Sequence, residues 1–235
     1  MCPEPDSGWA GLLACLEIDL RERPWLWSWS SVPAQRSHGA ATRRNRSRDR
    51  ARSWPSQNPA GAHFLTDRTL IDQLVRGSGA GIGDLVFDLG AGYGALTAPL
   101  VRTGARVIAI ELDPRLAERL RRRFGGDPQV GVVEADLRQV PLPRRPFRVV
   151  ASPPFALTTL LCRRLLGDRH VQLSGAELVL EWGAAKWLAN PEPRDRETAS
   201  WAARYEMRIV RRVPAASFSP SPSSDAAYLR IRRRR

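Results

Sequence analysis

The chain has 235 residues, which is enough for one full α/β domain with an appendage and a sizeable core. Its formal net charge is +13 at pH 7, and Lys186 is the only lysine. An arginine excess of this kind favours a polyanionic partner, because arginine pairs with phosphate in a bidentate fork, although a solvated arginine-rich surface gives the same composition. The 3 scattered cysteines exclude a disulfide framework and a zinc site.

No stretch of the sequence approaches the roughly 18 apolar residues of a membrane span. Glu17 and Asp19 interrupt the apolar part of the N-terminus, which is not typical of a secretory signal. We therefore expect a cytoplasmic protein with no membrane association and no metal, and we expect it to be a monomer.

Residues 1–55 carry no helical or strand period. Four tryptophans lie among residues 9–29, and an arginine-rich run follows over residues 36–52. This composition predicts a basic, disordered N-terminal extension over residues 1–55, or upstream sequence included by a misplaced start codon. The folded domain is expected over residues 56–235.

From Thr66 onward, helix and strand patterns alternate, and Thr66 itself is a candidate helix cap. The patterns predict helices over residues 67–76, 95–103, 114–124 and 158–166, and strands over residues 84–88, 106–111, 129–133, 147–151 and 176–182. This alternation predicts a parallel, doubly wound sheet. Two more strands, 207–213 and 226–231, follow without an intervening helix, which predicts an antiparallel hairpin at the sheet edge.

A glycine loop, Asp88-Leu-Gly90-Ala-Gly92-Tyr-Gly94, follows the first of these strands. Glycines let the backbone adopt positive φ and approach a ligand closely. The spacing is G-x-G-x-G rather than the G-x-G-x-x-G of dinucleotide binders, which disfavours a dinucleotide. Taken alone, the loop is also compatible with a tight turn.

Two acids follow the next two strands. Glu111 ends the second strand and is placed to accept hydrogen bonds from vicinal ribose hydroxyls, while Asp136 follows the third and is placed to accept from an adenine amino group. Either acid alone is often merely solvated. Together with the glycine loop they predict an adenosine-bearing ligand, and the absence of a phosphate-gripping loop favours a nucleoside without pyrophosphate. S-adenosyl-L-methionine fits this description.

The segment Ser152-Pro153-Pro154-Phe155 directly follows the fourth strand. An exocyclic amine on a base is a poor nucleophile because its lone pair is delocalised into the ring. A side-chain acceptor at Ser152 and the Pro153 carbonyl, both aimed at the amine, would favour a tetrahedral nitrogen in the transition state. The aromatic ring of Phe155 would stack on the extruded base. An isolated Pro-Pro turn with a core phenylalanine is the simpler alternative.

These motifs resemble the erythromycin-resistance (Erm) family of 23S rRNA adenine-N6 methyltransferases. Gly61-Ala-His63-Phe64-Leu65 is similar to that family's first motif, with Ala62 in place of the usual glutamine. The glycine loop and Ile110-Glu111-Leu-Asp113 match its cofactor motifs. Phe218-Ser-Pro-Ser-Pro222-Ser-Ser-Asp225 is similar to its C-terminal signature.

The resemblance implies a Rossmann-like, class I methyltransferase over residues 56–235, with a mostly parallel, seven-stranded sheet and an antiparallel edge hairpin. It implies that 23S rRNA is methylated and that the product confers macrolide-type antibiotic resistance. The residues it assigns to the cofactor are His63, Leu65, Gly90, Gly92, Glu111, Asp136 and Ser152, and those it assigns to catalysis are Ser152, Pro153 and Phe155.

The chain departs from the family in two ways. Most relatives carry asparagine where Ser152 stands, and serine reaches less far, so a lower efficiency is expected. The chain also stops at Arg235, which resembles a short form without the C-terminal helical domain that helps relatives hold RNA. Three alternatives remain: a small-subunit rRNA adenine dimethyltransferase, a DNA amino-methyltransferase, and a catalytically silent RNA-binding relative.

Overall fold

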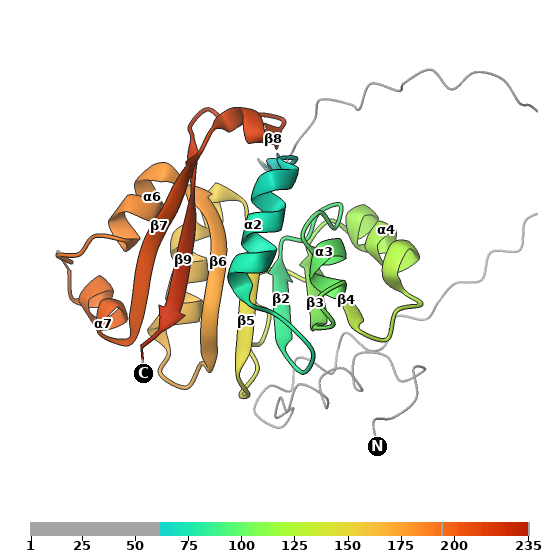
Figure 1. Ribbon diagram of the computed structural model, residues 1–235, viewed down its shortest axis with the longest axis horizontal. Coiled ribbons are helices and arrows are strands. Elements are labelled where there is room, and N and C mark those ends of the chain that lie inside the picture. Colours follow the sequence, from blue (N-terminus) through green and yellow to red (C-terminus); the bar gives the residue numbers. More distant parts are fainter. Residues whose placement is uncertain (1–61, 194, 235) are drawn as a thin grey trace, which may run out of the picture.

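A computed structural model of the chain describes residues 62–193 and 195–234 (Figure 1). The predicted N-terminal extension over residues 1–55 and Gly61 of the first motif lie outside these residues, as does Arg235. The strands are β1 (Phe64–Leu65), β2 (Leu85–Leu89), β3 (Arg106–Glu111), β4 (Val130–Glu134), β5 (Phe147–Ala151), β6 (Leu173–Glu181), β7 (Tyr205–Val213), β8 (Phe218–Ser219) and β9 (Ala226–Arg233). The helices are α2 (Arg68–Ser78), α3 (Thr97–Val101), α4 (Pro114–Phe124), α5 (Thr158–Cys162), α6 (Trp182–Leu188) and α7 (Arg196–Arg204).

The main sheet has seven strands in the order β4-β3-β2-β5-β6-β9-β7. All neighbouring pairs from β4 to β6 are parallel, whereas β9 pairs antiparallel with both β6 and β7. The predicted fold class, a mostly parallel seven-stranded sheet with an antiparallel terminal hairpin, is therefore confirmed. The order reverses between β2 and β5, which is where open α/β sheets bind their ligands.

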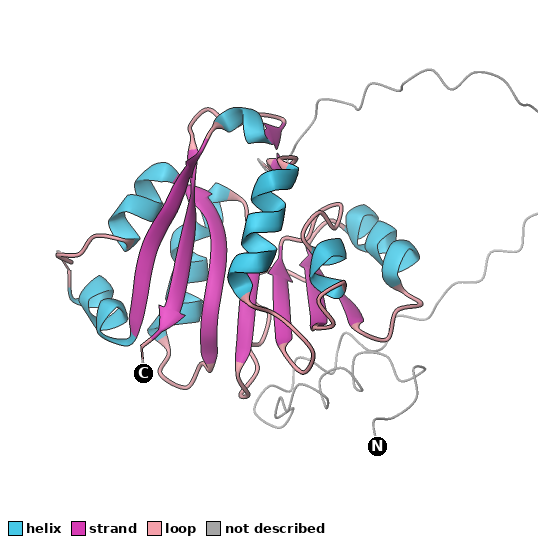
Figure 2. Cartoon of the chain, viewed as in Figure 1, coloured by secondary structure: helices cyan, strands magenta, loops and turns pink. Residues whose placement is uncertain are grey.

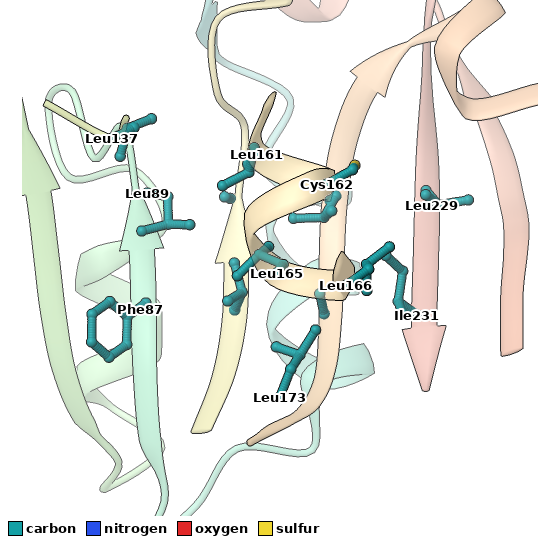
Figure 3. Close-up of a cluster of buried hydrophobic side chains, with 14 of the residues drawn as sticks. Phe87, Leu89, Leu137, Leu161, Cys162, Leu165, Leu166, Leu173, Leu229 and Ile231 are labelled. Atoms are coloured by element: carbon teal, nitrogen blue, oxygen red, sulfur yellow. The ribbon is translucent and has the colours of Figure 1, made fainter. Parts of the chain in front are cut away.

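Helices cover both faces of the sheet, as Figure 2 shows. Along β2 the buried residues alternate: Phe87 and Leu89 face the layer formed by α5, α6 and α7, while Val86 faces the layer that contains α2 and α3. Figure 3 shows the first of these clusters, in which Leu161 and Leu165 pack over the central strands. Burial on both faces explains why β2 reads as a continuous apolar run interrupted only by Asp88.

Several element boundaries differ from those that the sequence predicts. The helix expected over residues 158–166 is α5 followed by a π-helical turn (Arg163–Gly167), and the helix expected over residues 95–103 is only five residues long. Asp67 rather than Thr66 caps α2, because its carboxylate accepts the Leu70 N–H at 3.0 Å. Helices α6 and α7 and the small β1–β8 sheet were not predicted.

A buried charge cluster joins the terminal strand to the sheet. The Glu177 side chain on β6 is fully buried and accepts hydrogen bonds from Arg230 Nε at 3.2 Å and from the Arg232 guanidinium. Arg232 also donates to the Gly77 carbonyl at the end of α2, and Arg230 donates to the Tyr228 hydroxyl at 2.8 Å. The Glu177 carboxylate and its two arginine partners therefore link α2, β6 and β9, and these contacts fix the position of the antiparallel strand β9 against β6.

Replacing Glu177 with alanine is expected to lower the free energy of unfolding by about 3 kcal/mol, because it leaves two half-buried guanidinium groups without their shared counter-charge. The measurement is urea unfolding followed by circular dichroism. Glu206→Ala on β7 removes an exposed carboxylate and serves as the control, with an expected change of under about 0.5 kcal/mol. Equal effects of the two substitutions would show that the cluster adds no stability.

Candidate functional site

The glycine loop turns sharply where β2 ends. Gly90, Gly92 and Gly94 have φ of 79°, 54° and 76°, values at which a residue with a side chain would be strained. The Gly90 and Ala91 N–H groups both donate to the Ile110 carbonyl at 2.9 Å, which ties the loop to the end of β3. The loop thus lies at the carboxyl edge of the sheet, where Gly90 is half-buried and Gly92 and Gly94 are buried.

The glycine loop lies directly against the segment Ser152–Phe155 that follows β5. A Cβ built on Gly90 would be 3.7 Å from Pro153 Cα, 3.7 Å from Pro154 Cδ and 4.0 Å from Leu137. Parallel pairing of β2 with β5 produces this contact, because adjacent parallel strands end at the same edge. The two segments that the sequence assigned to cofactor and target are therefore neighbours in space.

Glu111 is held by backbone donors on both sides. Its Oε2 accepts the Gly92 N–H at 2.7 Å, and its Oε1 accepts the Asp113 N–H at 2.9 Å. Each carboxylate oxygen keeps further acceptor capacity, so the side chain remains able to accept two ribose hydroxyls. Leu112, the next residue, is 56% exposed, and an apolar side chain beside this acid offers a surface for a flat base.

Asp136 is clamped by a neighbouring arginine. Its Oδ2 accepts Arg138 Nε at 2.8 Å, and its Oδ1 accepts the Arg138 backbone N–H at 2.8 Å. Hydrogen bonding to Arg138 holds the pKa of Asp136 below its ordinary value. The carboxylate is therefore ionised and acts as an acceptor, and an adenine amino group would have to share it with Arg138.

Asp88 was not predicted as a site residue, yet it is the buried acid of this region. Its side chain is 1% exposed, and its Oδ2 accepts the Thr97 hydroxyl at 2.6 Å. The other oxygen, Oδ1, is buried without a hydrogen-bond partner among the described residues. Desolvation is the main cause that raises the pKa of Asp88 to about 7, and the negative charge of Glu111 adds to it. An unpartnered carboxylate oxygen here suits a ligand that brings a cation or an N–H donor, and S-adenosylmethionine carries both.

Ser152 and Pro153 present free acceptors at the edge of β5. The Ser152 hydroxyl makes no hydrogen bond within the part of the chain that the structure describes, and neither does the Pro153 carbonyl. The following carbonyl, that of Pro154, instead accepts the Leu157 N–H at 2.9 Å and begins a 3₁₀ turn. Both acceptors, which the sequence analysis assigned to the amine of the target base, are therefore available to bind such an amine.

The first motif and the C-terminal signature form one small sheet. β1 pairs antiparallel with β8, with Phe64 opposite Ser219 and Leu65 opposite Phe218. His63 makes a 2.8 Å hydrogen bond to the Pro220 carbonyl, and the Phe155 and Phe218 rings lie edge to face at 6.0 Å. The Leu65 side chain is 6% exposed and belongs to a core cluster, so the side chain itself is not available to a ligand.

The predicted site residues thus gather at one edge of the sheet, from five separate segments. Sequence reasoning missed Asp88 as a buried acid and Leu112 as an exposed apolar residue. The sequence did contain a signal for the burial of Asp88, because this acid lies within an otherwise apolar strand. In residues 62–193 and 195–234, no group of three or more histidine, cysteine, aspartate or glutamate side chains is arranged to hold a metal ion.

The raised pKa of Asp88 predicts a pH-dependent stability of the ligand-free protein. Between the unfolded value of 3.8 and the folded value of about 7, the folded chain keeps a proton that the unfolded chain has released. The Asp88 contribution to stability is therefore present at low pH and is lost as the pH rises to about 7. Asp88→Asn keeps the acceptor for Thr97 and does not titrate.

We expect the stability of Asp88→Asn relative to wild type to increase between pH 4.5 and pH 8, measured by urea unfolding at each pH. Wild-type and variant curves that stay parallel across this range would mean that the Asp88 carboxylate does not change its protonation on folding.

Comparisons with known proteins identify the family of the chain. The ribosomal RNA adenine dimethylase family matches residues 57–235. The rRNA adenine N-6-methyltransferase of Bacillus licheniformis is 31% identical over 180 residues, which cover 77% of this chain and 63% of the relative. The mycinamicin-resistance protein MyrB of Micromonospora griseorubida is 38% identical over 174 residues, 74% of this chain and 55% of the relative. The chain therefore spans less than two thirds of the length of either relative.

Among solved structures, that of the 23S rRNA methyltransferase ErmE superposes with a TM-score of 0.67 at 30% identity, over 73% of this chain and 70% of ErmE. A small-subunit relative also matches: ribosomal RNA small subunit methyltransferase A of Variovorax paradoxus is 34% identical over 73% of this chain and 69% of its own length. Within the described residues, no helix combines the length and apolar character needed to cross a membrane. The chain belongs to the ribosomal RNA adenine dimethylase family, whose methyl donor is S-adenosylmethionine.

Proposed function

We propose that the chain transfers a methyl group from S-adenosylmethionine to the N6 atom of an adenine in 23S rRNA, and that this modification confers macrolide-type resistance. The observation that carries the proposal is the contact of Gly90 with Pro153 and Pro154, which joins a cofactor loop to an amine-binding segment. A methyl donor and a base amine must meet within van der Waals distance to react, and this contact brings their binding segments together.

The cofactor would be held by the carboxyl edges of β2, β3 and β4. Glu111 would accept the ribose hydroxyls, Asp136 the adenine amine, and the Gly90–Gly92 backbone would lie along the ligand. The buried Asp88 carboxylate would offset the positive charge of the ligand. When bound, S-adenosylmethionine supplies an electrophilic methyl group on a positively charged sulfur.

The target adenine would be held by the segment after β5. Phe155, partly buried against Phe218, would stack on the extruded base. The Ser152 hydroxyl and the Pro153 carbonyl would accept from the amine and draw its nitrogen toward a tetrahedral geometry. This interaction strengthens as the nitrogen attacks, so it would stabilise the transition state more than the ground state.

The large-subunit target is supported by the likeness to ErmE, whose structure is described as that of a 23S rRNA methyltransferase. The proposed resistance is supported by the likeness to MyrB, which is named as a mycinamicin-resistance protein. A small-subunit rRNA target is the second candidate, favoured by the 34% identity to a small-subunit enzyme. The basic character of the full chain suits either RNA, because a net charge of +13 attracts phosphate regardless of sequence. The target base therefore has to be mapped.

The test is radiolabelled methyl transfer from S-adenosylmethionine to protein-free 23S and 16S rRNA, followed by reverse-transcription mapping of the modified base. The proposal expects incorporation into an adenine of 23S rRNA and a raised macrolide tolerance in cells that express the protein. Incorporation into 16S rRNA alone would replace the large-subunit target by the small-subunit one. An absence of incorporation into both RNAs would contradict the proposed activity.

Cofactor binding is expected to depend on Glu111 and Gly92. Glu111→Ala loses two hydrogen bonds to a charged acceptor, on the order of 1.5–3 kcal/mol each before compensation. Gly92→Val places a side chain at a φ of 54° and about 3.0 Å from the Phe64 ring, so it should deform the loop. Calorimetry with S-adenosylmethionine measures both, and Glu118→Ala, an exposed acid on α4, is the control. Wild-type affinity in both site variants would refute the cofactor assignment.

Turnover, in contrast, is expected to depend on Ser152 and Phe155. Ser152→Ala should lower the single-turnover rate by on the order of tenfold to a hundredfold while cofactor affinity stays near wild type, because the contact forms with the amine. Phe155→Ala should lower the rate through lost stacking. A Ser152→Ala rate equal to wild type would leave the Pro153 carbonyl as the sole group that orients the amine.

A further inference from the structure

The turn that follows β4 carries the acid assigned to the adenine of the cofactor. The Asp136 carbonyl accepts the N–H groups of Gln139 at 2.9 Å and of Val140 at 3.1 Å, and these bonds close the turn. Leu137 within the turn is 6% exposed, and its Cδ1 would lie 4.0 Å from a Cβ built on Gly90. The turn therefore packs against the glycine loop, and its position determines where the Asp136 carboxylate lies.

Arg164 holds this turn from a different element. Its guanidinium donates through Nη1 to the Leu137 carbonyl and through Nη2 to the Val140 carbonyl. Within the described part of the chain neither carbonyl has another donor, and both residues are buried. The planar guanidinium presents its donors at a fixed spacing, so this one side chain holds two points of the turn at once.

Arg164 lies in the continuation of the segment assigned to the target base. Ser152–Phe155 leads through a 3₁₀ turn into α5 and then into the π-helical turn Arg163–Gly167. Leu165, the residue after Arg164, belongs to the same buried cluster as Leu137 (Figure 3). π-helical turns occur frequently at functional sites. Apolar packing and two hydrogen bonds therefore join the target segment to the turn that carries the adenine acceptor.

Arg164 and Arg138 act on Asp136 in different ways. The hydrogen bond from Arg138 is the main cause that lowers the pKa of Asp136, and the positive charge of Arg164 lowers this pKa further. Arg138 is exposed and belongs to the turn itself, so it moves with the turn and does not fix the turn to the rest of the domain. Arg164 is half-buried and comes from another element, so its two hydrogen bonds do fix the turn.

We infer that Arg164 is a positioning residue for recognition of the cofactor: by holding the Leu137 and Val140 carbonyls, it directs the Asp136 carboxylate toward the 6-amino group of the adenine. This inference rests on the proposed cofactor site. Without the guanidinium, two buried carbonyls lose their donors, and the turn shifts until water or another donor reaches them. Selectivity for an amino group over an oxygen at this position of the base therefore depends on a residue that does not touch the ligand.

The experiment measures by calorimetry, without RNA, how the full chain binds S-adenosylhomocysteine and S-inosylhomocysteine, which has an oxygen in place of the 6-amino group. Wild type is expected to prefer the amino ligand by on the order of tenfold or more, because Asp136 accepts from the amine and repels the oxygen. In Arg164→Met the two affinities should come within about threefold of each other, mainly through weaker binding of the amino ligand. Arg164→Gln keeps an amide donor for one carbonyl and should lie between.

A double-mutant cycle shows whether Arg164 acts through Asp136. Asp136→Ala removes the acceptor, so adding Arg164→Met should then change the affinity for S-adenosylhomocysteine by less than about twofold, against a loss on the order of tenfold when Asp136 is present. A contribution of Arg164 to the fold alone would give equal losses in both backgrounds. Arg163→Met is the matched control, because this neighbouring arginine is exposed and pairs with Glu197, and it should keep the wild-type preference.

A wild-type preference for the amino ligand in Arg164→Met would overturn the inference and leave the proposed function intact. If circular dichroism shows that this variant does not fold, the same preference in Arg164→Gln overturns it. Equal losses in the two backgrounds of the cycle would do so as well. Equal affinities of wild type for the two ligands would contradict the assignment of Asp136, and a wild type that binds neither would contradict the proposed cofactor site. Either of these two results would remove the inference too.

Discussion

The close approach of Gly90 to the prolines after β5 is the constraint on which the site depends. A Cβ built on Gly90 would be in van der Waals contact with this segment, 3.7 Å from Pro153 Cα and 3.7 Å from Pro154 Cδ. The φ of 79° at Gly90 is what disfavours most other residues at this position. The contact exists because β2 and β5 are parallel neighbours at the point where the strand order reverses. Cofactor and target segments are in this way fixed to one rigid edge.

A second set of contacts holds the first and last described segments of the chain next to the site. The β1–β8 ladder brings residues 64–65 against residues 218–219, more than 150 positions apart, and so places His63 beside Phe155. Glu177 anchors β9 through Arg230 and Arg232, and β9 leads directly out of the segment that contains Pro220. The position of the imidazole therefore depends on both the small ladder and the buried charge cluster.

Local patterns in the sequence were sufficient to predict the central strands and their turns. β3 and β5 have the bounds that their apolar runs predict, and the glycine loop and the two acids lie at the predicted carboxyl edge. Pairing between distant segments is not encoded in a local period, so the β1–β8 ladder and the insertion of β9 between β6 and β7 were not predicted. Helix α6 begins with Trp182 directly after β6, and no loop residue marks this boundary.

The burial and the hydrogen-bond partners of individual acids also could not be predicted from the sequence. Asp88 reads as the first residue of a glycine loop, and only the packing around β2 shows that its carboxylate is buried and that one oxygen lacks a partner. Asp136 reads as a free acceptor, whereas Arg138, two residues later, binds it. In both cases the tertiary environment determines which lone pairs remain for a ligand.

The central claim is that the glycine loop and the Ser152–Phe155 segment form the two halves of one site. The direct measurement is the affinity of a bisubstrate ligand, in which the N6 atom of adenosine is joined by a short linker to the sulfur position of S-adenosylhomocysteine. The account predicts that wild type binds this ligand at least tenfold more tightly than S-adenosylhomocysteine, and that Phe155→Ala removes the gain without weakening S-adenosylhomocysteine itself. Equal affinities of wild type for the two ligands would contradict it.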